Sequence, residues 1–148
     1  MRRTALFALL MTGFVICGLA RAQFLVVPIP LPVERRSSDA DSDHAYRKDG
    51  ARHIYTALPT HIYKGRLPPL LYGIAITETD IDADGNVIDV RLLREPAAAE
   101  VGPWIHSLIR RMGPFPSPQK LDRVTYTEIW LVHKSGRFQL DTLTEGQD

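Results

Sequence analysis

Apolar and polar positions alternate in the middle of the chain, on either side of a short acidic turn. Residues 70–79 and 86–94 are rich in β-branched and large apolar side chains, and Asp84-Gly85 lies between them. An Asp-Gly pair between two such runs is typical of a tight turn that joins antiparallel strands. We therefore predict a β-hairpin whose turn spans residues 82–85.

The hydrophobic pattern changes to the helical period further along the chain. Val101 begins a stripe of apolar residues at spacings of three and four, and the stripe continues to Met112. Arg110 and Arg111 complement the negative end of a helix dipole, and Gly113-Pro114 stops the element. These features predict an amphipathic helix that lies on a sheet.

Three further segments complete the predicted order of elements. Residues 51–64 have helical composition, but Pro59 interrupts them and breaks or kinks the element. Residues 124–133 form the longest β-favouring run, and residues 137–143 alternate enough to form a last short strand. The order α-β-β-α-β-β predicts an α+β fold, a two-layer sandwich with an amphipathic helix packed on a small antiparallel sheet.

The first residues predict export from the cytoplasm. Arg2 and Arg3 precede an apolar run over residues 5–19, and Ala20-Arg21-Ala22 has the small-x-small pattern that signal peptidase cuts. We expect residues 1–22 to be a cleavable signal peptide, and the protein to be periplasmic without stable membrane insertion after cleavage. A retained anchor is the competing interpretation, although about 15 apolar residues are short for a span that needs about 20.

Residues 23–50 are expected to form a tether outside the core. Proline occupies every second position from Pro28 to Pro32, which suits an extended or polyproline conformation and excludes a central strand. The polar residues 34–43 have the composition of an unstructured linker. The folded domain is therefore expected over residues 51–148, with docking of the proline-spaced part onto the domain or onto a partner left open.

Composition argues against several classes of function. The only cysteine, Cys17, lies inside the predicted signal peptide, so no disulfide is expected after cleavage. The formal net charge is +1 and no basic stripe is present, which argues against nucleic acid as a partner. The chain has no G-x-S-x-G motif and no glycine-rich phosphate loop. We therefore expect a protein that is not an enzyme and needs no cofactor.

The acidic turn also supports a metal hypothesis. Asp80, Asp82 and Asp84, followed by Gly85, match the opening half of a calcium-binding loop. Such a loop closes with a bidentate glutamate at its twelfth position, which here is the cation Arg91. We expect the turn to join two strands, and a calcium-responsive domain with the three carboxylates as ligands is the alternative function.

Several features, taken in order, resemble the C-terminal domain of TonB, the periplasmic protein that couples inner-membrane energy to outer-membrane transporters. The resemblance covers about residues 54–132. It rests on a strand that ends Thr79-Asp80-Ile81-Asp82, the turn and strand from Asp84 to Val90, the helix to Arg111, the Phe115-Pro116-x-Pro118 loop and the aromatic-rich strand after it.

The resemblance implies protein binding by β-strand addition. In that family, a short segment at the transporter's N-terminus pairs with the exposed edge of the third strand, where unpaired amides and carbonyls supply affinity. The expected partner is an extended peptide of a cell-envelope protein, such as the N-terminus of an outer-membrane transporter, which implies a role in transport. Carried over to this chain, the partner-binding residues are Val124, Tyr126, Glu128, Trp130, Val132 and His133.

Three features depart from the family pattern. Its energy transducers keep an uncleaved membrane helix and a long proline-rich spacer, neither of which matches residues 1–50. We therefore expect a soluble periplasmic relative, an accessory or adaptor and not a full transducer. In addition, residues 137–143 would form a hairpin with the third strand and cover the edge that a partner needs.

Overall fold

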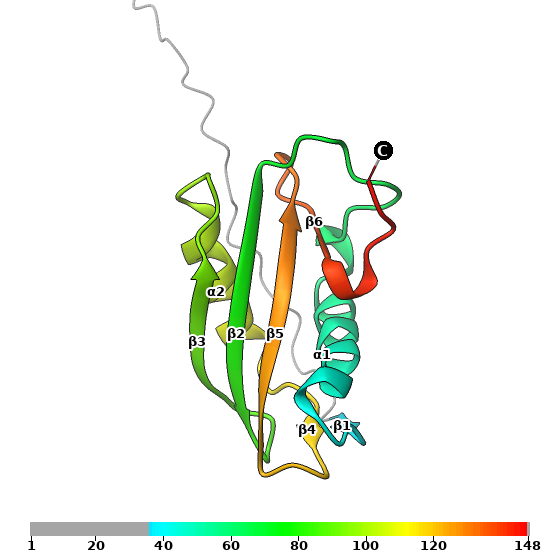
Figure 1. Cartoon of the computed structure of the whole chain (residues 1–148), viewed down its shortest axis with the longest axis vertical. Coiled ribbons are helices and arrows are strands. Elements are labelled where there is room, and N and C mark those ends of the chain that lie inside the picture. Colours follow the sequence, from blue (N-terminus) through cyan, green and yellow to red (C-terminus); the bar gives the residue numbers. More distant parts are fainter. Residues whose placement is uncertain (1–35, 148) are drawn as a thin grey trace, which may run out of the picture.

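An antiparallel sheet of four strands runs through residues 36–147, the part of the chain that the computed structural model describes (Figure 1). The strands are β2 (Gly73–Asp82), β3 (Val87–Arg94), β5 (Arg123–Val132) and β6 (Phe138–Leu140), in the spatial order β3-β2-β5-β6. A separate parallel pair joins β1 (Ser37–Ser38) to β4 (Ser117–Pro118). The predicted signal peptide and the proline-spaced part of the predicted tether lie outside the described residues.

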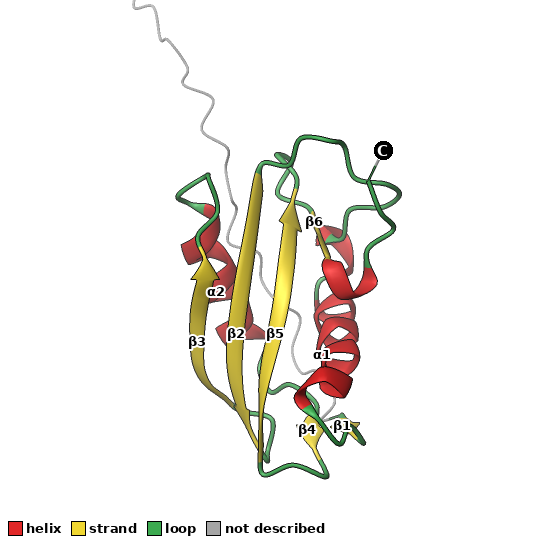
Figure 2. Cartoon of the chain, in the orientation of Figure 1, coloured by secondary structure: helices red, strands yellow, loops and turns green. Residues whose placement is uncertain are grey.

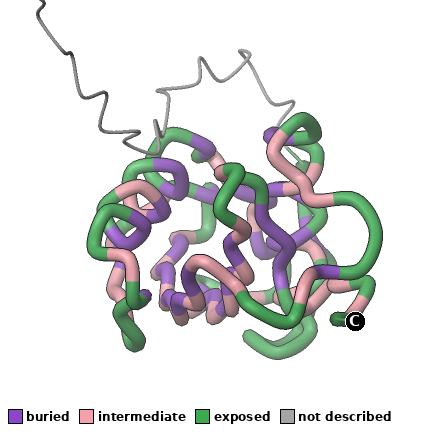
Figure 3. The backbone as a smooth tube through the Cα atoms, turned by 90° about the horizontal axis from the view of Figure 1, so that it is seen from above, coloured by how far each residue is buried: buried purple, intermediate pink, exposed green. Residues whose placement is uncertain are grey.

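Helices cover one face of the sheet. Side chains of β2 and β5 alternate between buried and half-buried, and successive side chains of a strand point to opposite faces. The helices α1 (Asp43–Ala57) and α2 (Val101–Met112) pack on the buried face, α1 against β5 and α2 against β3 and β2 (Figures 2 and 3). The α+β sandwich predicted from the sequence is therefore confirmed.

The predicted amphipathic helix is α2, with the expected bounds. Its apolar stripe is buried, whereas Trp104 is half-buried and meets the ring of Phe138 edge-on, with 6.1 Å between ring centroids. Gly113 ends the helix, as the sequence predicts. No helix within residues 36–147 has both the length and the apolar composition that crossing a bilayer requires.

Aromatic rings fill the space between α1 and the sheet. Tyr46 of α1 lies edge-on to Tyr126 of β5, with ring centroids 6.1 Å apart, and Phe115 lies 6.0 Å from Tyr126 on another side. Gly50 faces the same ring so closely that an added Cβ would lie 2.9 Å from it. The glycine therefore lets α1 approach β5, and burial of these large rings holds the helix there.

The start of α1 corrects the predicted domain boundary at residue 51. The helix begins at Asp43, and the side chain of Ser42 caps it by accepting a hydrogen bond from the amide of Ala45 at 3.3 Å. Residues 43–50 are therefore part of the folded unit and not a tether. The predicted break at Pro59 is confirmed, because α1 ends at Ala57 and a short 3-10 helix follows.

The strands also differ in length from their predicted ranges. β2 continues to Asp82, so the first two carboxylates of the acidic turn belong to a strand. β6 has three residues, and a 3-10 turn over Asp141–Leu143 replaces the rest of the strand predicted over residues 137–143. The hairpin partner of β5 is therefore shorter than the sequence pattern suggests.

Candidate functional site: the two sheet edges and the acidic turn

The residues predicted to bind a partner lie mostly inside the protein. Val124, Tyr126, Glu128, Trp130 and Val132 are at most 1% exposed, because they occupy the β5 positions that face the helices. His133 follows the strand and is half-buried, beside a surface pocket of about 320 Å³ that Leu70 and Tyr72 also line. In this structure these side chains are therefore inaccessible to a partner, and a partner along β5 would contact the backbone edge of the strand.

That edge is only partly taken by another strand. β5 pairs with β2 along its whole length, from Arg123 to Val132. On its other side, β6 pairs only with Trp130, Leu131 and Val132. Figure 1 shows β6 beside the upper end of β5 and α1 alongside the remainder. The β5 edge from Arg123 to Ile129 therefore has no strand neighbour among the described residues.

Side chains bind the backbone groups along this free part of the edge. The amide of Thr125 donates to Oδ1 of Asp43 at 3.3 Å, and Nε of Arg47 donates to the carbonyl of Thr127 at 2.9 Å. The amide of Ile129 donates to Oε1 of Glu128 at 3.0 Å. These three outward-pointing positions are thus occupied by groups that can leave without breaking a β-ladder.

Glu128 connects the elements around the edge. Its buried carboxylate accepts a hydrogen bond from the hydroxyl of Tyr126 at 3.0 Å and from that of Thr142 at 3.1 Å, and it lies 3.4 Å from Nη2 of Arg47. Burial, and then the charge of Glu128, raises the pKa of Tyr126 well above its usual range, so the phenol keeps the proton that it donates. One carboxylate thereby links α1, β5 and the turn after β6.

A second buried polar side chain fastens the last residues of the chain. Nε2 of Gln139 donates to the carbonyls of Tyr63 and Gly65 at 2.9 and 2.7 Å. Its Oε1 accepts hydrogen bonds from the hydroxyl of Thr144 at 2.8 Å and from the amide of Glu145 at 3.1 Å. We call residues 137–147 the C-terminal segment, and Gln139 holds it in place beside β5.

Sequence reasoning did not identify Asp43, Arg47 or Thr142 as functional residues. The first two fall in the predicted tether and the third in the predicted last strand. Tyr46, Gly50 and Ile54 recur at four-residue intervals and are buried on one face of α1. That spacing, with Ser42 as a cap, is the signal that could have revealed the helix and its two edge-binding side chains.

The carboxylates of the acidic turn make contacts that build the hairpin. Oδ1 of Asp82 accepts hydrogen bonds from the amides of Asp84 and Asn86 at 2.9 and 2.8 Å, and the side chain of Asn86 donates to Oδ2 at 3.0 Å. The bonds from Asn86 are the main reason that the pKa of Asp82 is lowered. Asp82 therefore acts as the side-chain acceptor of an Asx turn.

Asp80 points to the face of the sheet opposite the two helices, where it contacts Arg91. The guanidinium lies 2.8 Å from Oδ2 of Asp80 and also contacts Glu78 and Asp89, and the hydrogen bond to Arg91 is the largest cause of the lowered pKa of Asp80. The hydroxyl of Thr125 donates to Oδ1 of Asp80 at 2.9 Å. In residues 36–147, no three or more His, Cys, Asp or Glu side chains are grouped to hold a metal ion.

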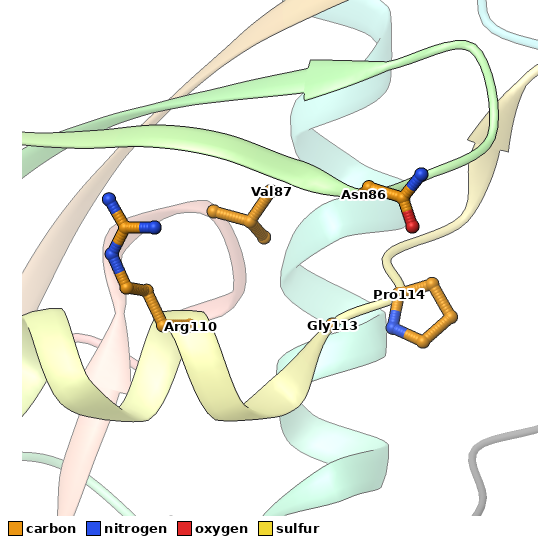
Figure 4. A pocket seen from close by; sticks show the side chains of 5 residues that line it. All are labelled: Asn86, Val87, Arg110, Gly113 and Pro114. Carbon is orange, nitrogen blue, oxygen red and sulfur yellow. The ribbon is translucent and has the colours of Figure 1, made fainter.

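The opposite edge of the sheet is formed by β3. No strand within the described residues pairs with its outer side, and Ile88 and Leu93 are 53% and 55% exposed. At the start of β3, a pocket of about 260 Å³ lies against the end of α2 (Figure 4). Its lining residues are Asn86, Val87, Arg110, Gly113 and Pro114.

Comparison with known proteins adds no relative from which a role could be transferred. No protein-family model, no curated protein and no solved structure matches this chain.

Proposed function

We propose that this chain is a non-enzymatic interaction module of the periplasm that binds an extended peptide of a cell-envelope protein by β-strand addition at β5. The observation that carries the proposal is the β5 edge from Arg123 to Ile129. Within residues 36–147 this edge has no strand neighbour, and side chains bind its outward backbone groups. An incoming strand replaces those side-chain bonds with main-chain bonds and leaves the sheet intact.

The resemblance to the TonB C-terminal domain supports the same site. The third strand of the predicted order, which the resemblance implicates in binding, is β5. The signal peptide predicted over residues 1–22 would bring the protein to the compartment in which outer-membrane transporters expose their N-terminal segments. The function proposed is therefore that of an accessory or adaptor in envelope transport.

The C-terminal segment competes with a bound peptide for the upper part of the same edge. β6 holds three residues of β5, whereas a peptide along the whole strand would also need those positions. To pair with β5 between Arg123 and Ile129, the peptide must displace the carboxylate of Asp43 and the guanidinium of Arg47. Hydrogen bonds to such charged groups contribute about 1.5–3 kcal/mol each. We therefore expect modest affinity, with a Kd in the micromolar range.

The experiment is a calorimetric titration of the exported protein with N-terminal peptides of outer-membrane transporters from the same organism. Thr127→Pro removes an outward-pointing amide from the free part of the edge, where proline is tolerated in a folded sheet. Thr127→Val is the matched control, because it keeps the amide. We expect Thr127→Pro to weaken binding at least about tenfold and Thr127→Val to bind as the wild type does. Absence of binding to the wild type, or equal binding by both variants, would contradict the proposal.

A further inference from the structure

The face of the sheet opposite the two helices carries two kinds of side chain along its length. In Figure 2, β2 and β5 lie in front of α2, so this face is turned toward the viewer. Ile76 pairs with Ile129 and Ile74 with Leu131, and residues that pair across strands point to the same side of the sheet. These four residues, which we call the aliphatic patch, are half-buried. Further along the strands, polar and charged pairs follow on this face: Glu78 with Thr127, Asp80 with Thr125 and Asp82 with Arg123.

The aliphatic patch lies where both strands are apolar on both sides. Residues 73–76 and 129–132 are uninterrupted apolar runs, and they pair with each other in the sheet. An antiparallel sheet with one solvated face normally alternates apolar and polar side chains, whereas continuous apolar runs are typical of strands that are covered on both faces. Neighbouring aliphatic side chains on an uncovered face therefore indicate a surface to which another molecule binds.

The charges on either side of the patch differ. Among the described residues, the end of the face beyond Glu78, which we call the acidic end, has four carboxylates and three guanidinium groups near them: Glu78, Asp80, Asp82 and Asp89 with Arg91, Arg110 and Arg123. In the other direction, Lys134 and Arg137 are exposed in the turn after β5. Residues 129–137 include no carboxylate. The patch thus separates an acidic end from a basic one.

A second copy of the chain complements both features of this face. Two copies related by a twofold axis present the same patch to each other. An axis along the strands would place acidic end against acidic end. An axis across the strands, through the patch, instead places patch on patch and directs the acidic end of each copy toward the basic end of the other. This second arrangement buries the apolar surface and also pairs opposite charges.

The spacing along the strands fits the second arrangement. The patch is centred on Ala75 and Trp130, which pair with each other. Glu78 and Asp80 follow Ala75 by three and five residues, which is about 10 and 17 Å along β2. Lys134 follows Trp130 by four residues, about 13 Å in the opposite direction. Lys134 of one copy therefore lies at a level between Glu78 and Asp80 of the other.

The size of the face predicts weak association. Three strands about 4.8 Å apart and five rows of side chains about 6.7 Å apart give a face of about 14 by 33 Å. Each copy therefore contributes about 450 Å², and the total of about 900 Å² is below the range of about 1,200–2,000 Å² that stable complexes bury. A transient dimer with a Kd on the order of 100 μM is expected.

We propose that the aliphatic patch is the contact surface of a homodimer in which the sheets of two copies pack face to face with antiparallel strands. Lys134 of each copy lies beside the acidic end of the other. Sheets packed in this way are about 10 Å apart, so both edges of each sheet stay accessible. The inference concerns the face of the sheet and does not depend on the function proposed at the β5 edge.

The test is sedimentation velocity of the exported protein between about 5 and 500 μM, a range that spans the expected Kd. Ile76→Thr/Ile129→Thr makes the patch more polar and keeps β-branched side chains, which strands favour. Ile88→Thr is its matched control, because Ile88 is 53% exposed on β3 and lies outside the patch. Lys134→Glu reverses the charge in the turn after β5, and Lys48→Glu makes the same change at an exposed position of α1.

We expect Ile76→Thr/Ile129→Thr to weaken self-association at least about tenfold and Lys134→Glu to weaken it about threefold, while both controls associate as the wild type does. A wild type that stays monomeric at about 500 μM overturns the proposal, and so does a dimer that the double variant retains. Equal association of Lys134→Glu and Lys48→Glu contradicts the antiparallel arrangement. Because Lys134 lies in a turn, its variant tests the proposal even if the double variant does not fold.

Discussion

Gly85 is the residue at which the hairpin turn meets the loop that leads to β4. Its φ is +86°, a conformation that side chains other than glycine rarely adopt, and an added Cβ would lie 2.1 Å from the carbonyl oxygen of Phe115. The carbonyl of Gly85 accepts a hydrogen bond from the amide of Phe115 at 2.8 Å. The position therefore requires glycine for both backbone conformation and space.

Gly85→Ala is expected to lower the free energy of unfolding by more than about 2 kcal/mol, because it combines backbone strain with a clash against main-chain atoms. Gly65→Ala is the matched control: Gly65 has a φ of +80°, but no atom of residues 36–147 lies within 4 Å of an added Cβ. It should cost only the strain of about 1 kcal/mol. Urea unfolding of the two variants measures the difference, and equal losses would show that the contact with Phe115 is unimportant.

Arg91 provides a second prediction at this scale. Its hydrogen bonds are the largest causes of the lowered pKa values of Asp80 and Asp89. Carboxyl groups with lowered pKa values in the folded state contribute stability above their unfolded pKa of about 4, and that stability is lost as the pH falls through the lower folded values. Arg91→Met should therefore be less stable than the wild type at pH 7, by a difference that shrinks between pH 5 and pH 3.

Urea denaturation midpoints at a series of pH values test this prediction. The buried His53, whose pKa is lowered mainly by desolvation, destabilises the wild type and the variant alike as the pH falls below about 6.5, so it does not affect their difference. Arg94→Met is the control, and its pH dependence should follow that of the wild type. A difference between Arg91→Met and the wild type that stays constant from pH 7 to pH 3 would rule out the carboxylates as its source.

At the scale of elements, α1 and the C-terminal segment each cover part of the β5 edge. α1 supplies Asp43 and Arg47 to its free part, while β6 covers its last three residues and Gln139 fastens the segment that carries β6. The contacts of Gln139 are side-chain bonds to loops and do not belong to the sheet. Loosening them should lower the free energy needed to release β6, to which the burial of Phe138 and Leu140 also contributes.

Gln139→Ala is therefore expected to strengthen peptide binding. Loss of its hydrogen bonds should lower the free energy of releasing β6 by about 1–2 kcal/mol. A peptide that binds the released state then gains up to about tenfold in affinity. Gln119→Ala is a suitable control, because Gln119 is exposed and, among the described residues, its side chain donates only to the Ser117 hydroxyl. Calorimetric titration compares the two; unchanged or weaker binding by Gln139→Ala would mean that β6 does not compete.

The elements that local patterns define could be predicted from the sequence. The hairpin follows from Asp84-Gly85 between two β-favouring runs, and α2 follows from an uninterrupted apolar stripe. The first turns of α1 do not follow from the apolar pattern, since Gly50 takes a place in its buried face where an apolar side chain is expected. The edge contacts could not be predicted, because Asp43 and Arg47 reach β5 residues about 80 positions away in the sequence.

At the scale of the whole molecule, the two edges of the sheet differ in what covers them. The β5 edge is held by side chains and a short strand, which a peptide can displace. The β3 edge has no described strand beside it, and its register against β2 is interrupted between Val87 and Asp89 and between Leu92 and Arg94. This difference favours β5 over β3 as the edge for a partner, because an irregular strand pairs less readily with a further strand.

The most direct test of the account is amide hydrogen exchange of the exported protein with and without a saturating transporter peptide. We predict that the outward-pointing amides of Thr125, Thr127 and Ile129 become at least about tenfold slower on binding, because main-chain bonds replace side-chain contacts and solvent. Val90 and Leu92 of β3 should not change. Binding that leaves the β5 amides unchanged, or that slows those of β3 instead, would contradict strand addition at β5.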